Sequence, residues 1–206
     1  MNDESIWQRW HEHYSKIGIS SEDICRDGII DYETYIRAKP KILFVMKEVN
    51  QWPGGDLREM LHNGPVYPMW HTVARWAAGI LRGFPPFVEI NKHEVFVESI
   101  RSIATINLKK ISGQGYANMS IVNAFAFMDR HLLLDQIQMI NPDIIVAGGT
   151  FDSLIWLLDL QVDPEDPWSR SVLDHRRNIK VIPWRHPGRV DNRETYDKLR
   201  DFFQTA

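Results

Sequence analysis

The segment PKILFVMKEVNQWPGG, residues 40–55, restricts the fold of this chain more than any other stretch of its sequence. It contains a short, continuous apolar run at residues 42–45, with proline before the run and proline and glycine after it. A run of that length between turn residues is typical of a strand buried on both faces of a parallel sheet. Polar residues follow the run directly: Lys47, Glu48, Asn50 and Gln51. Because ligands bind outside the carboxyl ends of such strands, the segment predicts a central strand that ends at a ligand site.

Three later segments have the same apolar character, and helical patterns separate all four. We expect strands at residues 42–46, 103–107, 143–147 and 179–184. Strands that alternate with helices form a parallel sheet with helices on both faces. The predicted fold class is therefore α/β, a three-layer α/β/α sandwich with a four-stranded parallel sheet. No repeat or linker divides the chain, so residues 1–206 are expected to form a single domain.

Helices are expected where apolar residues recur at helical spacing. These segments are residues 6–17, 32–36, 70–81, 94–100, 120–140 and 192–203, the fifth as one unbroken helix. Thr150 is the expected N-cap of a further helix after the third strand. The pair Gly148-Gly149 before it fits either a tight strand-to-helix turn or a phosphate-binding turn. The missing G-x-G-x-x-G pattern favours the tight turn.

The composition excludes several classes of protein. The formal net charge is −3, so no overall basic field attracts nucleic acid, and any such contact must use a local patch. Cys25 is the only cysteine, which excludes an internal disulfide and a cysteine-based metal cluster. No apolar run approaches transmembrane length, and the N-terminal residues are charged and amphipathic, unlike a signal peptide. We therefore expect a cytoplasmic protein that does not contact membranes.

Conspicuous polar residues lie at the ends of the expected strands: Glu48 and Asn50, then Asn107, and finally His186. A polar residue after one strand is often only a solvated loop position. Since the carboxyl ends of parallel strands meet at one edge of a sheet, agreement among several ends favours a shared site. Trp52, beside the first strand end, fits either stacking on a planar ligand or packing in the core. His11 with His13, and His62 with His71, lack the spacing and acidic companions of zinc ligands, so these are expected to be surface histidines.

Taken in order, four motifs of the chain resemble the uracil-DNA glycosylase-like superfamily. In that superfamily a strand such as ILFVG enters a G-x-(D/N)-P loop, and FVMKEV at residues 44–49 occupies the equivalent place. A middle strand ends in an asparagine that contacts the base, as ATIN does here with Asn107. A third strand resembles NPDIIVAGG, found here from Asn141, and the last enters an H-P-S-P loop, for which WRHPGRV supplies His186. The resemblance covers most of residues 40–192 and implies the family's α/β/α fold.

The resemblance implies a DNA glycosylase that hydrolyses the N-glycosidic bond of a damaged or deaminated base. Its partner is then single- or double-stranded DNA, or a nucleotide, and the family uses neither metal nor cofactor. Glu48 is the candidate carboxylate beside the sugar, and His186 the candidate donor to the departing base. The candidate base-binding residues are Asn107, Asn50 and Trp52. The candidate phosphate ligands are Arg185, Arg189, Lys109 and Lys110.

The chain also departs from the family's pattern. Met46 stands where the family has glycine, Glu48 where it has Asp or Asn, and Val49 where it has proline. Gly188 and Arg189 replace the Ser-Pro of the last motif. The altered first motif and the negative net charge favour an alternative, an inactive module of the same fold that binds a nucleotide or nucleic acid. A third reading is a hydrolase of small nucleosides or nucleotides.

Overall fold

The computed structural model describes residues 3–52 and 54–205. Its helices are α1 (Asp3–Ser15), α2 (Tyr32–Arg37), α3 (Leu57–His62), α4 (Pro68–Arg82), α5 (Phe87–Ile90), α6 (His93–Arg101), α7 (Met119–Met128), α8 (Arg130–Ile140), α9 (Phe151–Leu158) and α10 (Asn192–Thr205), with a 3-10 turn η1 (Ser21–Asp23). Its strands are β1 (Cys25–Arg26), β2 (Gly28–Ile29), β3 (Ile42–Met46), β4 (Gly55–Asp56), β5 (Ile103–Asn107), β6 (Ile144–Gly148), β7 (Val172–Asp174) and β8 (Ile179–Trp184). No helix of this part of the chain combines the length and apolar character needed to cross a bilayer.

The main sheet is mixed and has six strands in the order β2-β5-β3-β6-β8-β7. The four central strands are parallel, and they are the four segments expected from the sequence, with the third displaced by one residue. The prediction of a four-stranded, wholly parallel sheet is wrong, because β2 and β7 add antiparallel edges. These edge strands have two and three residues, too few to show an apolar pattern. β1 and β4 form a separate two-stranded sheet.

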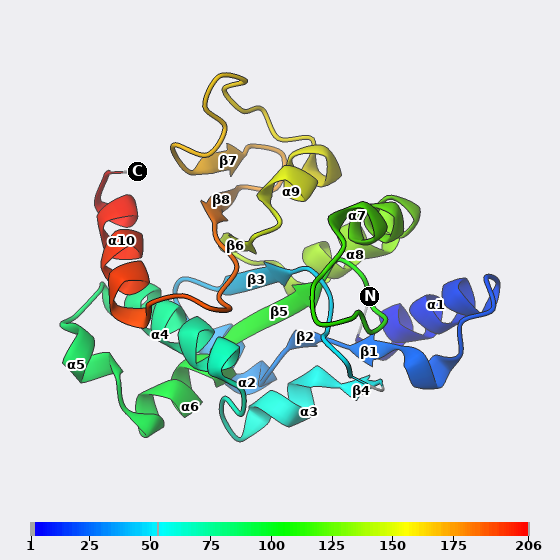
Figure 1. The fold of residues 1–206 in the computed structure, drawn as a ribbon, viewed down its shortest axis with the longest axis horizontal. Coiled ribbons are helices and arrows are strands. Elements are labelled where there is room, and N and C mark those ends of the chain that lie inside the picture. Colours follow the sequence, from blue (N-terminus) through cyan, green and yellow to red (C-terminus); the bar gives the residue numbers. More distant parts are fainter. Residues whose placement is uncertain (1–2, 53, 206) are drawn as a thin grey trace.

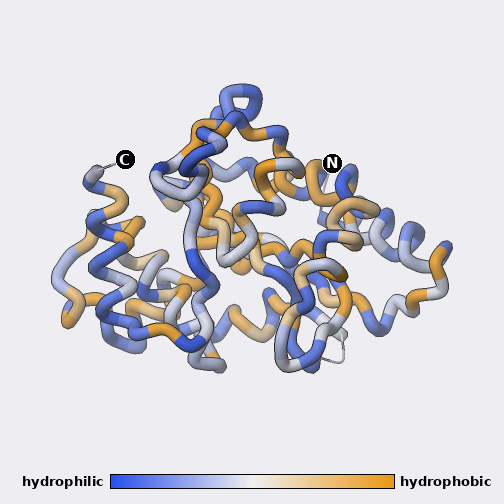
Figure 2. Tube along the Cα trace, turned by 45° about the horizontal axis from the view of Figure 1, so that its top comes forward, coloured by the Kyte–Doolittle hydropathy of each residue, from blue (hydrophilic) through white to orange (hydrophobic). Residues whose placement is uncertain are grey.

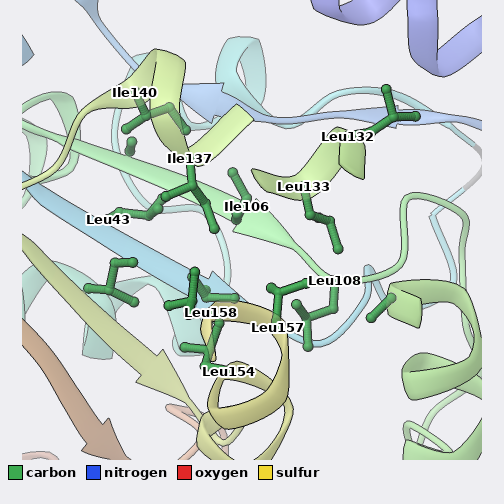
Figure 3. Close-up of a cluster of buried hydrophobic side chains, with 14 of the residues drawn as sticks. Leu43, Ile106, Leu108, Leu132, Leu133, Ile137, Ile140, Leu154, Leu157 and Leu158 are labelled. Atoms are coloured by element: carbon green, nitrogen blue, oxygen red, sulfur yellow. The ribbon is translucent and has the colours of Figure 1, made fainter. Parts of the chain in front are cut away.

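Helices cover the sheet on both faces, so the α/β class and the layered arrangement are as expected. One core packs α1, α7, α8 and α9 against one face, and a second core packs α3, α4, α6 and α10 against the other. Figure 1 shows these two groups of helices on opposite sides of the strands. Leu43 and Ile106 point from the sheet into the first core, toward Ile137 and Leu154 of the covering helices (Figure 3). The strands are buried on both faces, which explains their continuous apolar sequences.

The chain is hydrophobic where these layers meet and hydrophilic in its peripheral loops. Figure 2 shows this for the loop at the top of the view, which joins α9 to β7. Its residues 163–166 are all exposed. The two cores therefore account for the apolar segments found in the sequence.

The helix expected over residues 120–140 is two helices, α7 and α8, divided at Asp129. The Asp129 carboxylate is fully buried, where it accepts a hydrogen bond from Tyr14 Oη (2.7 Å) and contacts His13 Nε2 (2.9 Å). Both partners belong to α1, so this carboxylate attaches the helix break to the N-terminal helix. A contact across more than a hundred residues leaves no trace in local periodicity, and the sequence pattern therefore missed the break.

The order of the strands places a topological switch point between β3 and β6. The chain passes from β3 to β5 on one side, and then crosses to β6 and β8 on the other side of β3. In open α/β sheets, ligands bind at such a point, outside the carboxyl ends of the strands. The residues that follow β3, β5, β6 and β8 therefore form the candidate site.

Candidate active site

The ends of β3, β6 and β8 bring Lys47, Gly149 and His186 together. Gly149 has φ +73°, a left-handed conformation that favours glycine. A Cβ atom at this position would lie 3.1 Å from both Lys47 Cε and His186 Cβ. The lysine and histidine side chains therefore both pack on this glycine, directly at the switch point. In residues 3–52 and 54–205, no carboxylate forms an ion pair with Lys47.

The polar groups of the turn that contains Gly149 are hydrogen-bonded within the protein. The Gly149 N–H donates to the carbonyls of Ala147 (2.7 Å) and Trp184 (2.9 Å), so it is already occupied. Thr150 precedes α9, but its hydroxyl donates to the Val45 carbonyl (2.8 Å) and forms no cap hydrogen bond. The expected N-cap role of its side chain is therefore wrong, because the hydroxyl instead links the β6 turn to β3. These contacts favour the tight-turn interpretation of the two glycines.

His186 is half-buried, and a backbone hydrogen bond decides which of its ring nitrogens carries the hydrogen. The Gly188 N–H donates to His186 Nδ1 (3.0 Å), so Nδ1 is an acceptor and the neutral ring carries its hydrogen on Nε2. Burial, and second the positive charge of Lys47, lower the pKa of His186 to about 4. The imidazole is therefore neutral near pH 7 and offers an N–H donor at Nε2.

Glu48 is held against the loop that follows β5. Its carboxylate forms an ion pair with Lys109, and both side chains are 6% exposed. Lys109 Nζ also donates to the Ser112 carbonyl (3.1 Å). A Cβ atom on Gly113 would overlap Glu48 Oε1, so a larger residue there would displace the carboxylate from this position. The predicted catalytic carboxylate is thus enclosed and carries a cation as partner.

Asn107 belongs to a buried polar cluster at the β2 edge of the sheet. Its backbone N–H donates to Asp27 Oδ2 (2.7 Å), and its Nδ2 lies 3.4 Å from the same oxygen. Lys110 Nζ contacts both oxygens of Asp27 (2.8 and 2.9 Å), and Gln136 Nε2 donates to Oδ1 (2.9 Å). Three residues, from β5, the loop after it and α8, therefore converge on one carboxylate, and they fix the end of β5.

The phosphate-binding assignment of Lys110 is corrected by this cluster. Lys110 is fully buried, ion-paired with Asp27, and lies 5.0 Å from the ring centroid of Trp10. A ligand phosphate has no route to an ammonium group enclosed in this way. Lys109 is 5% exposed as a residue and is paired with Glu48, so its charge is also engaged within the protein.

The remaining predicted residues lie on the surface or against the core. Asn50 and Arg185 are exposed. Arg189 is exposed and stacks on Tyr116, which the sequence interpretation did not single out. Trp52 is half-buried against the second core, and its buried Nε1 has no hydrogen-bond partner among the described residues. Its indole therefore packs with the protein, in line with the core interpretation left open for it.

Glu48, Asn107 and His186 thus lie after or at the ends of β3, β5 and β8, at the same edge of the sheet. Their side chains have separate partners: Lys109 for Glu48, Asp27 for Asn107, and Gly188 for His186. Lys47 was noted in the sequence among the polar residues after β3 but was given no role in the site. Successive side chains of an extended chain point to opposite sides. Because Lys47 directly precedes Glu48, the sequence already indicated that its side chain points away from the carboxylate, toward a different part of the sheet edge.

Other parts of the described surface offer less chemistry. A shallow hollow beside α1 is lined by seven residues, none of them from the carboxyl edge of the sheet: Glu4, Ser5, Trp7, Gln8, His11, Glu12 and Arg26. No group of three or more His, Cys, Asp and Glu side chains in residues 3–52 and 54–205 could hold a metal ion. Comparison with protein-family models and with curated proteins finds no match for the chain, so a functional assignment rests on the residues of the site.

Proposed function

We propose that the protein hydrolyses the N-glycosidic bond of a base in DNA, with His186 at the departing base and Glu48 beside the sugar. The observation that carries this proposal is the state of His186. Its Nδ1 accepts from the Gly188 N–H, its pKa is lowered to about 4, and its Nε2–H is a donor at the switch point. A neutral imidazole donor is suited to an oxygen that gains negative charge during bond cleavage.

The chemistry requires opposite charges at two places. As the bond between C1′ and the base nitrogen breaks, its electron pair leaves with the base, and the sugar becomes cationic. The His186 Nε2–H donates to the departing base, and the ammonium of Lys47, which packs on the same glycine, adds positive charge nearby. Water then adds to C1′ and loses a proton, and solvent protonates the base.

Glu48 is the carboxylate on the sugar side of this proposal. It follows β3 directly and can orient water or offset the sugar cation. Asn107 remains the candidate contact to the base edge, because its Nδ2 faces Asp27 and its Oδ1 has no hydrogen-bond partner among the described residues. A base in a duplex must leave the stack to reach such a site.

A second candidate function is a binding module that recognises a nucleotide or nucleic acid without cleaving it. The ion pair between Glu48 and Lys109 specifically favours it. An enclosed carboxylate with a cation beside it exerts a weaker field on a sugar than an unpaired one does. The choice between the two functions therefore depends on whether Glu48 acts on a substrate despite this partner.

The test is a screen of single- and double-stranded oligonucleotides that carry deaminated, oxidised or alkylated bases. A glycosylase leaves abasic sites, which alkali converts to strand breaks. We expect such breaks with at least one base, and we expect His186→Ala to slow the single-turnover rate by about 10²-fold. His175→Ala is the matched control, because His175 is exposed in the turn between β7 and β8.

Two other outcomes of the screen contradict the proposal. Gel shifts without abasic sites assign the protein to the binding-module function. If chromatography shows that only free nucleosides or nucleotides are hydrolysed, and no oligonucleotide is, the protein is a small-molecule hydrolase.

A further inference from the structure

Two loops that are far apart in the sequence meet at Tyr116 and Arg189. Tyr116 lies between β5 and α7, and Arg189 lies between β8 and α10. Arg189 Nη1 donates to Tyr116 Oη (2.6 Å), and the guanidinium carbon lies 4.5 Å from the centroid of the tyrosine ring. Both residues are exposed, Tyr116 by 77%. Their contact is therefore a link on the surface and contributes little to either core.

The strands that carry these loops are not neighbours. In the sheet, β3 and β6 lie between β5 and β8. Neighbouring strands are spaced by about 4.8 Å, so β5 and β8 are about 14 Å apart. The contact therefore joins two loops that start on either side of the carboxyl ends of β3 and β6. That is the switch point, where Lys47 and His186 pack on Gly149.

The Arg189 side of the link is coupled to His186. Arg189 has φ +59°, a left-handed conformation that is uncommon for a residue other than glycine. The preceding residue, Gly188, donates its N–H to His186 Nδ1. The same turn therefore presents Arg189 to Tyr116 and fixes the histidine ring. Strained residues of this kind occur where the surrounding contacts hold them in place.

The Tyr116 side of the link extends from a fixed base. The Gly113 N–H donates to the Val49 carbonyl (2.8 Å), and the Gln51 N–H donates to the Gly113 carbonyl (3.1 Å). The next three residues, 114–116, are all exposed. The loop is therefore anchored to the segment after β3 at Gly113, while its tip is held across the sheet edge by Arg189.

We propose that Tyr116 and Arg189 form a releasable clasp over the ends of β3 and β6, closed in this structure, which must open before a ligand reaches Lys47 and His186. An exposed cation–π contact with one hydrogen bond is weak, so thermal motion can open it. The meaning of the clasp for catalysis rests on the function proposed above. Its existence does not, because access to the site can be measured without any substrate.

The experiment measures the rate at which Lys47 is acetylated by the water-soluble reagent sulfo-N-hydroxysuccinimidyl acetate. Peptide mass spectrometry gives the rate at Lys47 and at Lys92, an exposed lysine before α6 that serves as internal control. We expect Tyr116→Ala to accelerate acetylation of Lys47 about fivefold, by removing both contacts. Tyr116→Phe keeps the ring and loses the hydrogen bond, so we expect a smaller increase. The rate at Lys92 should not change.

A second measurement closes the clasp covalently. In the double variant Tyr116→Cys/Arg189→Cys, a bis-maleimide with a reducible linker can join the two loops, and the native Cys25 is buried. We expect the tether to protect Lys47 at least as well as the native contact does, and reduction to restore fast acetylation. Equal Lys47 rates in the wild type, Tyr116→Ala and the tethered protein would overturn the clasp. Because no nucleic-acid substrate and no base cleavage enter this test, the clasp can fail while the glycosylase proposal stands, and the reverse.

Discussion

At His186, one backbone hydrogen bond decides which ring nitrogen carries the hydrogen, and burial, aided by one neighbouring cation, keeps the ring neutral. The Gly188 N–H occupies Nδ1, and burial together with Lys47 disfavours the imidazolium. A histidine of this kind acts as a hydrogen-bond donor near pH 7 and cannot act as a strong acid. Two predictions test the neutral state of His186 and the contribution of Lys47 to it.

The first concerns stability and pH. The pKa of His186 is about 4 in the folded protein and about 6.5 in an unfolded chain, so the unfolded state binds the proton more readily. Its contribution to stability is complete above about pH 6.5 and is lost as the pH falls toward about 4. We expect His186→Gln, which cannot titrate, to lose less free energy of unfolding than the wild type between about pH 7 and pH 4.5. Urea unfolding measures both, with His93→Gln as exposed control; identical pH dependence in all three proteins contradicts a buried neutral His186.

The second concerns Lys47. Its charge is the second cause of the lowered pKa of His186, after burial. Lys47→Met keeps most of the side-chain volume and removes the charge, so the pKa of His186 should rise toward its ordinary value. An NMR titration of the ring protons reports the change, and Lys92→Met, at an exposed site, should leave the titration unaltered. If the pKa of His186 does not move, the two side chains do not share the site.

At the scale of elements, the buried cluster around Asp27 joins β2, the end of β5 and α8. It holds a complete ion pair with Lys110, and both side chains are 0% exposed. We expect Lys110→Met to lower the free energy of unfolding by about 3–5 kcal/mol, because it leaves a buried carboxylate without its cation. The double variant Asp27→Asn/Lys110→Met should recover part of that loss, since no charge is then buried. Urea unfolding gives the values, and Lys198→Met, which breaks an exposed pair with Glu194, should cost less than about 1 kcal/mol.

The elements differ in how well the sequence predicts them. β3 and β5 were expected at their observed residues, because strands buried on both faces have continuous apolar sequences. β2 and β7 were missed, because two or three residues carry no periodicity. The break between α7 and α8 was also missed, since the partners of Asp129 lie on α1, far away in the sequence.

At the scale of the whole molecule, parallel topology explains which parts of the site were predictable. Residues after β3, β5 and β8 were expected at one edge because the carboxyl ends of parallel strands meet there. The partner of each side chain was not predictable, because Glu48 and Lys109, or Asp27 and Lys110, are brought together by the packing of distant segments. Lys110 is the clearest example. A lysine near a strand end suggests a phosphate contact, but Lys110 forms a buried ion pair with Asp27.

Glu48 decides whether the whole molecule is an enzyme or a binding module. On the glycosylase proposal its negative charge assists the cationic sugar, and Lys109 holds the carboxylate in place. We expect Glu48→Gln, which keeps the shape and removes the charge, to slow the single-turnover rate by about 10²-fold or more while ligand binding stays nearly intact. Lys109→Met leaves the charge of Glu48 without its cation, so it should slow the chemistry much less than Glu48→Gln if the variant remains folded. Circular dichroism checks folding, and Glu59→Gln, at an exposed position on α3, controls for the loss of a carboxylate elsewhere. Unchanged rates in Glu48→Gln would exclude this carboxylate from the mechanism, whereas a loss of binding in Glu48→Gln and Lys109→Met alike would give the ion pair a purely structural role.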